Sequence, residues 1–165
     1  MSNCKYIIFV SWSLNLEYVK KCRFENGYVY QPVFSCQTCY IEQCEADKKE
    51  TITQQELSKK VQPHGICLAC MLTCHEGHEV HELYSKASFK CDCGNSRLPF
   101  SCQLTAEKEY SNDLNRYNTT FFDIYCHCNL TSDQNSTVKY NFMAECMNCE
   151  DWYHNTHLLP PILSK

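Results

Sequence analysis

The segment from Cys67 to Gly94 constrains the fold more than any other part of the chain. Its sequence, CLACMLTCHEGHEVHELYSKASFKCDCG, holds a Cys-x-x-Cys pair, a His-x-x-His pair and a Cys-x-Cys pair in close succession. A gap of one or two residues lets a single turn present both members of a pair to one metal ion, and zinc takes four thiolate or imidazole ligands in a tetrahedron. Two buried thiols would explain one pair, but three mixed pairs in a row indicate zinc.

The high cysteine content leaves two frameworks to compare, zinc sites and disulfides. The chain has 15 cysteines among 165 residues, and N-x-[ST] sequons at Asn118, Asn129 and Asn135 are compatible with a secreted disulfide protein. However, histidines stand at ligand spacing beside the cysteines, an odd number of thiols cannot all pair, and the start of the chain lacks a clear signal cleavage site. We therefore expect a reduced, zinc-loaded protein inside the cell, in the cytoplasm and/or the nucleus.

Charge and hydropathy argue against two classes of partner. The net charge of −4 and the pI near 6.0 provide no basic face for a phosphate backbone, so direct nucleic-acid binding is not expected. No run of roughly 18 apolar residues is present, so we expect no membrane-spanning segment.

The first segment expected to supply a metal ligand begins at Cys22. Residues 1–21 are expected to form a flexible or weakly packed N-terminal arm. The Asn26–Gly27 dipeptide, with apolar residues on both sides, is a strong hairpin signal. We predict a small hairpin that carries Cys22 on one side and the Cys36–Cys39 pair on the other.

A polar insert at residues 40–64 contains the clearest helix signal. Thr53 and Glu56 form a capping box, and Pro63 stops the helix. The pattern predicts a short helix over 54–61, which we interpret as part of a solvated excursion from the zinc domain.

A second cluster of cysteines and histidines follows the expected linker at residues 104–124, in which a helical turn is predicted over 105–110. The cluster begins at residue 125 and contains Cys126-x-Cys128, Cys146-x-x-Cys149 and His154-x-x-His157. In cross-braced zinc modules the first pair joins the third. We expect one complete site from Cys126, Cys128, His154 and His157, and half a site from Cys146 and Cys149.

These motifs resemble two known zinc modules. The chain from Cys22 to Cys102 resembles the UBR box, the zinc domain of N-recognin ubiquitin ligases. The matching pieces are Cys22-Arg-Phe, Ser35-Cys36-x-x-Cys39, Cys67-x-x-Cys70, His75-x-x-His78 and Cys91-Asp-Cys93-Gly94. From Tyr125 to His157 the chain resembles a PHD finger that is truncated at its C-terminus and has His-x-x-His in place of the usual His-x-x-Cys. The order of the two modules is similar to that of a small E3 ubiquitin ligase of the UBR family.

The resemblance implies how the zinc ligands are shared. One site would use Cys36, Cys39, His75 and His78, and a second would use Cys22, Cys67, Cys70 and Cys91. A third would share Cys70 and add Cys93, Cys102 and a histidine that follows. Here Gln103 follows, so the fourth ligand is open between Cys74, His81 and a water molecule, or the site is empty.

The resemblance also implies residues that bind a substrate. UBR boxes hold a basic N-terminal residue with carboxylates, and Asp92 matches one of these acids while Asn95 stands in place of the next. PHD fingers that read methylated lysine hold the ammonium in an aromatic cage, and Trp152, Met143 and Tyr125 match cage positions.

Together these patterns predict a small, zinc-stabilised, loop-rich α+β protein, with a UBR-type zinc domain at 22–103 and a partial PHD-type finger at 125–165. The predicted function is substrate recognition in the ubiquitin system. As an E3 ubiquitin-protein transferase it would bind protein N-termini or peptide tails, bring them close to a ubiquitin-charged E2, and need no catalytic nucleophile of its own. The alternative is a reader of peptides or histone tails without ligase activity.

Overall fold

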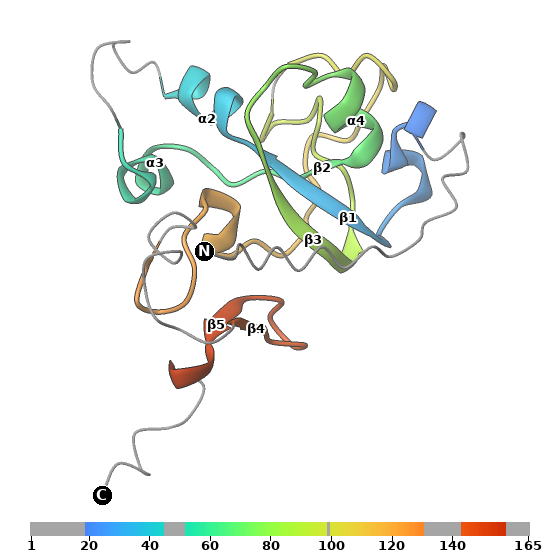
Figure 1. The fold of residues 1–165 in the computed structure, drawn as a ribbon. Helices are drawn as coiled ribbons and strands as arrows, with labels where there is room; N and C mark the ends of the chain where they lie inside the picture. The colour runs from blue at the N-terminus through green and yellow to red at the C-terminus, as the bar shows by residue number, and fades with distance from the viewer. Residues whose placement is uncertain (1–18, 45–51, 99, 131–142, 158–165) are drawn as a thin grey trace, which may run out of the picture.

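The computed structural model describes residues 19–44, 52–98, 100–130 and 143–157 (Figure 1). Nearly all of the expected N-terminal arm therefore lies outside the described residues. Among the helices that are described, none has the length and apolar character needed to cross a bilayer.

A three-stranded antiparallel sheet forms the centre of the first module. Strand β1 (Val29–Cys36) lies between β2 (Ile66–Cys67) and β3 (Val80–Phe89), as Figure 1 shows. The second half of β1 is almost wholly buried, which suits its β-branched and aromatic residues. The segment after His78 forms a single strand of ten residues, β3.

Strand β3 contains a bulge that reorients one side chain. Val33 of β1 faces both Leu83 and Tyr84, because the register shifts between the Pro32–Ser85 and Phe34–Glu82 pairs. Tyr84 has φ 59°, a left-handed conformation that costs a non-glycine residue free energy. Tyr84 is half exposed as a result, whereas Leu83 points into the core.

The predicted hairpin at Asn26–Gly27 is wrong. The segment before Gly27 is a short 3-10 helix, η1 (Arg23–Asn26), and the Gly27 N–H donates to the Phe24 carbonyl over 3.0 Å. Gly27 does take a positive φ of 71°, so the dipeptide turns the chain without pairing two strands. Strand β1 instead pairs with β2 and β3, because the cysteines of these distant segments must meet.

Two short helices present the Cys-x-x-Cys pairs. Helix α2 (Gln37–Gln43) follows Cys36 and contains Cys39, and helix α4 (Leu68–Thr73) follows Cys67 and contains Cys70. Residues three apart lie on the same side of a helical turn, so each helix directs a pair of thiols to one point.

The insert forms the predicted helix but is packed against the module. Helix α3 (Gln54–Lys60) begins at the Thr53 capping box, in which the Thr53 N–H donates to Glu56 Oε2 over 2.9 Å. Leu57 is fully buried against Tyr40, Phe122 and Ile124. Our interpretation of the insert as a solvated excursion is therefore wrong, because helix α3 has an apolar side that the sequence pattern did not assign to the core.

Residues 104–124, expected as a linker, also pack onto the first module. No helical turn forms over 105–110. The 3-10 helix η2 (Thr119–Phe122) supplies Phe121 to a cluster with Val33, Leu83 and Phe89. This segment thus closes one face of the sheet.

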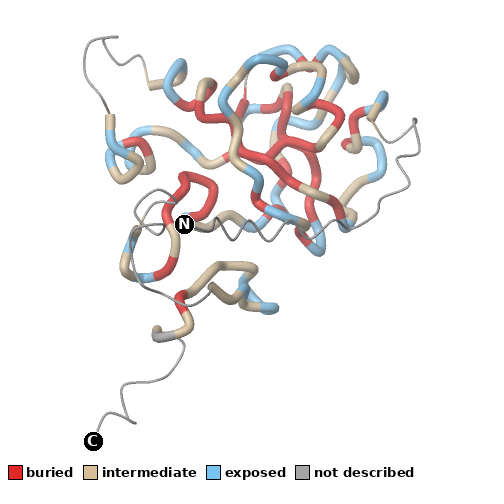
Figure 2. Tube along the Cα trace, viewed as in Figure 1, coloured by how far each residue is buried: buried red, intermediate tan, exposed pale blue. Residues whose placement is uncertain are grey.

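The second module is built on a two-stranded sheet of β4 (Met143–Glu145) and β5 (Trp152–His154), followed by the 3-10 helix η3 (Asn155–His157). Lys86 of β3 joins the modules: its Nζ donates to the Glu150 carbonyl over 2.8 Å and lies 3.7 Å from Glu145 Oε1. Figure 2 shows that buried positions are dense around the first sheet and sparse around β4 and β5. The expected fold class, small, loop-rich α+β with clustered cysteines and histidines, is confirmed.

Candidate metal centres

The first ligand set contains two thiols and two imidazoles from segments far apart in the sequence. Cys36 ends β1, Cys39 lies in α2, and His75 and His78 follow α4. The Sγ–Nδ1 distances are 3.4 Å for Cys36–His78, 3.4 Å for Cys39–His75 and 3.5 Å for Cys39–His78. Zinc bonds of about 2.3 Å to sulfur and 2.0 Å to nitrogen place such atoms about 3.5 Å apart in a tetrahedron, so the set fits zinc.

The two thiols of this set influence each other's titration. Their mutual hydrogen bond lowers the pKa of Cys36 and raises the pKa of Cys39. Thiols bind zinc as thiolates, so metal binding releases protons and metal affinity depends on pH.

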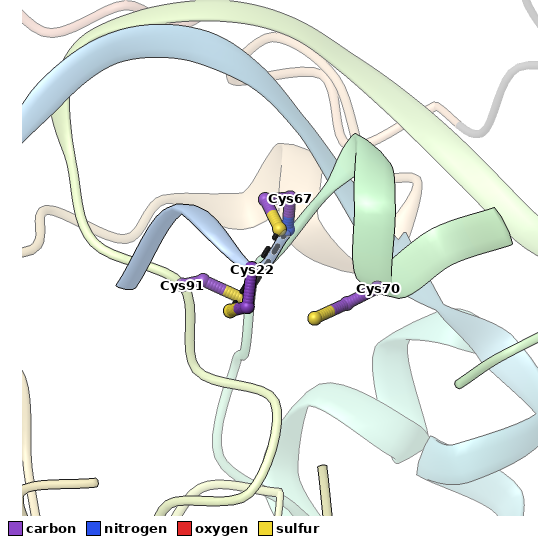
Figure 3. A group of neighbouring side chains, drawn as sticks. All are labelled: Cys22, Cys67, Cys70 and Cys91. Atoms are coloured by element: carbon purple, nitrogen blue, oxygen red, sulfur yellow. Dashed lines mark hydrogen bonds between the residues drawn. The ribbon is translucent and has the colours of Figure 1, made fainter. Parts of the chain in front are cut away.

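Two all-cysteine sets lie next to each other around α4. Figure 3 shows the sulfurs of Cys22, Cys67, Cys70 and Cys91 directed toward one another, with 4.0 Å between the Cys22 and Cys67 sulfurs. The second set is Cys70, Cys74, Cys93 and Cys102. Its Cys70–Cys102 and Cys74–Cys102 sulfur distances are 3.7 and 4.0 Å, close to the value of about 3.8 Å that a tetrahedral zinc requires. Cys70 belongs to both sets.

Cys74 takes the position that the sequence left open. It caps α4 one turn after Cys70, so both sulfurs lie on the same side of the helix. The Gln103 N–H donates to Cys74 Sγ over 3.3 Å. His81 lies on β3 opposite Ser35 and belongs to none of the ligand groups in the described part of the chain.

The second module brings together one complete set, Cys126, Cys128, His154 and His157. The sulfur–Nδ1 distance is 3.3 Å in both the Cys126–His157 and the Cys128–His154 pair. Cys146 and Cys149, expected as half a site, belong to none of the ligand groups among the described residues. Cys149 is exposed, with its sulfur 3.7 Å from Tyr153 Oη.

Comparison with known proteins finds a zinc-finger family for each of the two modules. Residues 20–105 match the family "Putative zinc finger in N-recognin (UBR box)", and residues 120–164 match the family "UBR7-like PHD finger". The chain belongs to the UBR-box zinc-finger family. Its cofactor is zinc, because both matched modules are zinc fingers and the cysteines and histidines lie at zinc-binding distances.

Several curated proteins are similar to the chain. It is 37% identical over 146 residues to the mouse and human proteins named "Putative E3 ubiquitin-protein ligase UBR7", an alignment that covers 86% of this chain and 30% of each relative. It is 29% identical over 134 residues to "Protein mlo2" of Schizosaccharomyces pombe, covering 81% of this chain and 35% of that protein. The chain thus spans about a third of the length of these relatives. No solved structure matches it.

Asp92 of the UBR box, which the resemblance places among the substrate-binding acids, is buried in the structure. The carboxylate is fully buried and accepts hydrogen bonds from Gly65 N (2.9 Å), Asn112 Nδ2 (2.7 Å) and Tyr117 Oη (2.9 Å). Burial raises the pKa of Asp92, and these donors oppose the rise. Asp92 therefore ties the segment after the UBR box to the loop between two metal ligands.

Asn95 is likewise buried, and both polar atoms of its side chain are hydrogen-bonded within the protein. Its Nδ2 donates to Asp92 Oδ1 over 2.9 Å, and its Oδ1 accepts from the Arg97 N–H over 2.9 Å. Residues 112, 115 and 117 cover Asp92, a long-range contact that no local pattern shows.

The three expected cage residues of the PHD-type finger lie near the junction of the modules. The Cys126 N–H donates to the Trp152 carbonyl over 2.9 Å, which holds Tyr125 beside β5. Met143 pairs with His154 and Glu145 with Trp152, so these side chains share one face of the small sheet. The Trp152 ring packs on Tyr84, with ring centroids 4.8 Å apart. Sequence reasoning missed Tyr84, because it belongs to the UBR box and only the bulge in β3 brings it to the finger.

Proposed function

We propose that the chain is the substrate-recognition part of an E3 ubiquitin ligase and that it binds basic peptide tails at the junction of its two modules. The support for the ubiquitin system is the similarity to proteins named as E3 ligases and the match to the UBR box. The described cysteines lie mostly in metal-ligand groups, which suits a ligase that brings substrate and ubiquitin-charged E2 together and forms no covalent intermediate.

The observation that carries the choice of ligand is the aromatic pair of Tyr84 and Trp152. Tyr84 is half exposed, and Glu145 stands opposite Trp152 in the sheet. Burial raises the pKa of Tyr84, and the nearby carboxylates of Glu82 and Glu145 raise it further, so acidic groups lie close to the aromatic pair. Aromatic faces beside carboxylates attract an ammonium group, which a lysine-containing tail would supply.

The burial of Asp92 separates this proposal from N-terminal recognition. A basic N-terminus would need carboxylates that it can reach, and Asp92 is covered by Asn112 and Tyr117. We therefore favour peptide tails over N-termini as the substrate feature. We also propose that the protein acts in the cytoplasm and/or the nucleus, since thiolate ligands persist where thiols stay reduced.

Peptide binding tests the recognition part of the proposal. The zinc-loaded chain is titrated with a lysine-containing tail peptide, unmodified or methylated on the lysine amine, and with the same peptide carrying glutamine. We expect binding only when the ammonium is present, and about tenfold weaker binding by Trp152→Ala. Tyr84→Ala should weaken binding several-fold. Tyr110→Ala, which removes a ring that is 83% exposed, serves as the control. Equal binding of the lysine and glutamine peptides would rule out the junction as an ammonium site.

Ubiquitin transfer tests the ligase part. The chain is incubated with ubiquitin, E1, a panel of E2 enzymes and a protein that carries the bound tail. Ubiquitin attached to that protein supports a ligase. Tail binding without transfer by any E2 would leave a binding module and reject the ligase.

A further inference from the structure

The two all-cysteine zinc sites of the UBR box form one cluster with an excess of negative charge. Each site has four candidate ligands and Cys70 belongs to both, so seven thiolates would hold two zinc ions. Seven thiolates and two divalent cations leave a net charge of about −3. Cys70 and Cys91 are fully buried. Buried charge of one sign is costly unless a counter-charge or hydrogen-bond donors lie close by.

Lys108 supplies such a charge at the boundary of the two sites. Its Nζ donates to Cys22 Sγ over 3.1 Å and to the carbonyl oxygen of Cys93. Cys22 is a ligand of one site and Cys93 of the other. The ammonium group of Lys108 therefore contacts ligand residues of both zinc sites.

The surroundings of Lys108 leave the cluster as its main electrostatic partner. Both Lys90 and Lys108 lie over the Phe24 ring, with their Nζ atoms 4.2 and 5.1 Å from its centroid. Lys90 Nζ, however, forms an ion pair with Glu109 over 2.7 Å. Among the described residues, no carboxylate lies within ion-pair distance of Lys108. The charge of Lys108 is thus available to the thiolates.

The segment that carries Lys108 is fixed to the cluster by a second contact. Asn112 and Asn115, a few residues further along, both donate through Nδ2 to Asp92 Oδ1, over 2.7 and 3.2 Å. Asp92 stands between the ligands Cys91 and Cys93. Residue 108 lies between the two matched family segments, which end at 105 and begin at 120, so neither family match includes it.

We propose that Lys108 is a positioning residue for the seven-cysteine cluster: its ammonium group compensates the charge of the thiolates, holds Cys22 in place by an N–H···S hydrogen bond, and slows the loss of zinc. An N–H···S bond withdraws electron density from a thiolate, which makes the sulfur a poorer target for protons and electrophiles. The segment between the modules then stabilises the zinc cluster through Lys108. This inference goes beyond the proposed function and does not depend on it.

The test compares zinc release from the full chain and from three variants. Lys108→Met removes the charge at similar length, Lys108→Arg keeps the charge, and Lys60→Met removes an exposed lysine of α3 as a matched control. Release to a strong chelator is followed with a zinc indicator. Loss of a neighbour of a metal ligand typically weakens metal binding by about 10–100-fold, so we expect Lys108→Met to release zinc at least about tenfold faster. Lys108→Arg should stay within about threefold of the wild type, and Lys60→Met should not change.

Two further readouts separate charge compensation from simple structural support. In the cobalt-substituted chain, Lys108→Met should shift the thiolate-to-cobalt charge-transfer band to lower energy, and Lys60→Met should not. Alkylation mapped by mass spectrometry should be faster at Cys22 and unchanged at Cys126. Unchanged zinc release and an unchanged band in Lys108→Met would overturn the proposal. If Lys108→Met does not fold, Lys108→Arg decides: wild-type release supports the role of the charge, and release at least tenfold faster rejects it.

Discussion

The UBR box and the PHD-type finger both bind metal through cysteine and histidine, but the structure around the ligands differs between them. The UBR box combines three ligand sets with a three-stranded sheet and buried apolar clusters. The described part of the finger has one complete set, a two-stranded sheet and few buried side chains. A two-stranded hairpin is at best marginally stable in water. The comparison indicates that the finger depends mainly on its metal site and on a few contacts with the UBR box, whereas metal and an apolar core of its own hold the UBR box together.

Loss of one ligand should have the largest effect and should differ between the regions. Cys70→Ser affects two zinc sites, so we expect two zinc ions fewer per chain and loss of structure across the UBR box. Cys128→Ser affects one site and should remove one zinc and unfold the finger alone, since a structural zinc supplies on the order of 10 kcal/mol. Native mass spectrometry and amide NMR spectra measure both outcomes. Loss of a single zinc in Cys70→Ser would show that Cys70 is not shared.

Apolar packing in the UBR box predicts the next largest effect. Leu57→Ala should lower the free energy of unfolding of the UBR box by about 3 kcal/mol, because Leu57 is fully buried against Tyr40 and Phe122. Ile41→Ala, at a side chain that is 44% exposed, is the control. Denaturant unfolding measures the difference in the free energy of unfolding. A loss below about 0.5 kcal/mol would show that helix α3 is a solvated excursion and not part of the core.

The link between the modules predicts a smaller effect, located in the finger. Lys86→Met removes a buried cation that contacts Glu145 and the Glu150 carbonyl, and a hydrogen bond to a charged group is worth about 2 kcal/mol. Amide hydrogen exchange in β4 and β5 should therefore become about thirtyfold faster, while exchange in β1 stays unchanged. Equal acceleration in both sheets would mean that Lys86 supports the UBR box itself.

The capping box predicts the smallest effect. Thr53→Ala removes the cap of α3, which we expect to lower the stability of the UBR box by about 1 kcal/mol. A Thr53→Ser variant keeps the hydroxyl group and should stay close to the wild type in thermal unfolding. An equal loss in both variants would show that the methyl group of Thr53 matters more than its hydrogen bond.

The ligand sets and the capping box were accessible from the sequence because both depend on short, regular spacing. Cys36, Cys39, His75 and His78 meet as the resemblance implied, and α3 begins at Thr53. The prediction of a hairpin at Asn26–Gly27 failed because a glycine with positive φ can end a 3-10 helix as well as form a hairpin turn.

The remaining features depend on contacts between distant segments. Asp92 was expected to contact a substrate, but Asn112 and Tyr117 cover it from about 20 residues further along the chain. Tyr84 reaches Trp152 only because of the bulge in β3. No spacing within either module encodes these contacts.

The central claim is that coordination of zinc at four described ligand groups determines the structure of both regions. The most direct measurement is the number of zinc ions bound per chain, obtained by native mass spectrometry of the full chain. We expect four zinc ions, three in the UBR box and one in the finger. Three or fewer in a folded chain would contradict it.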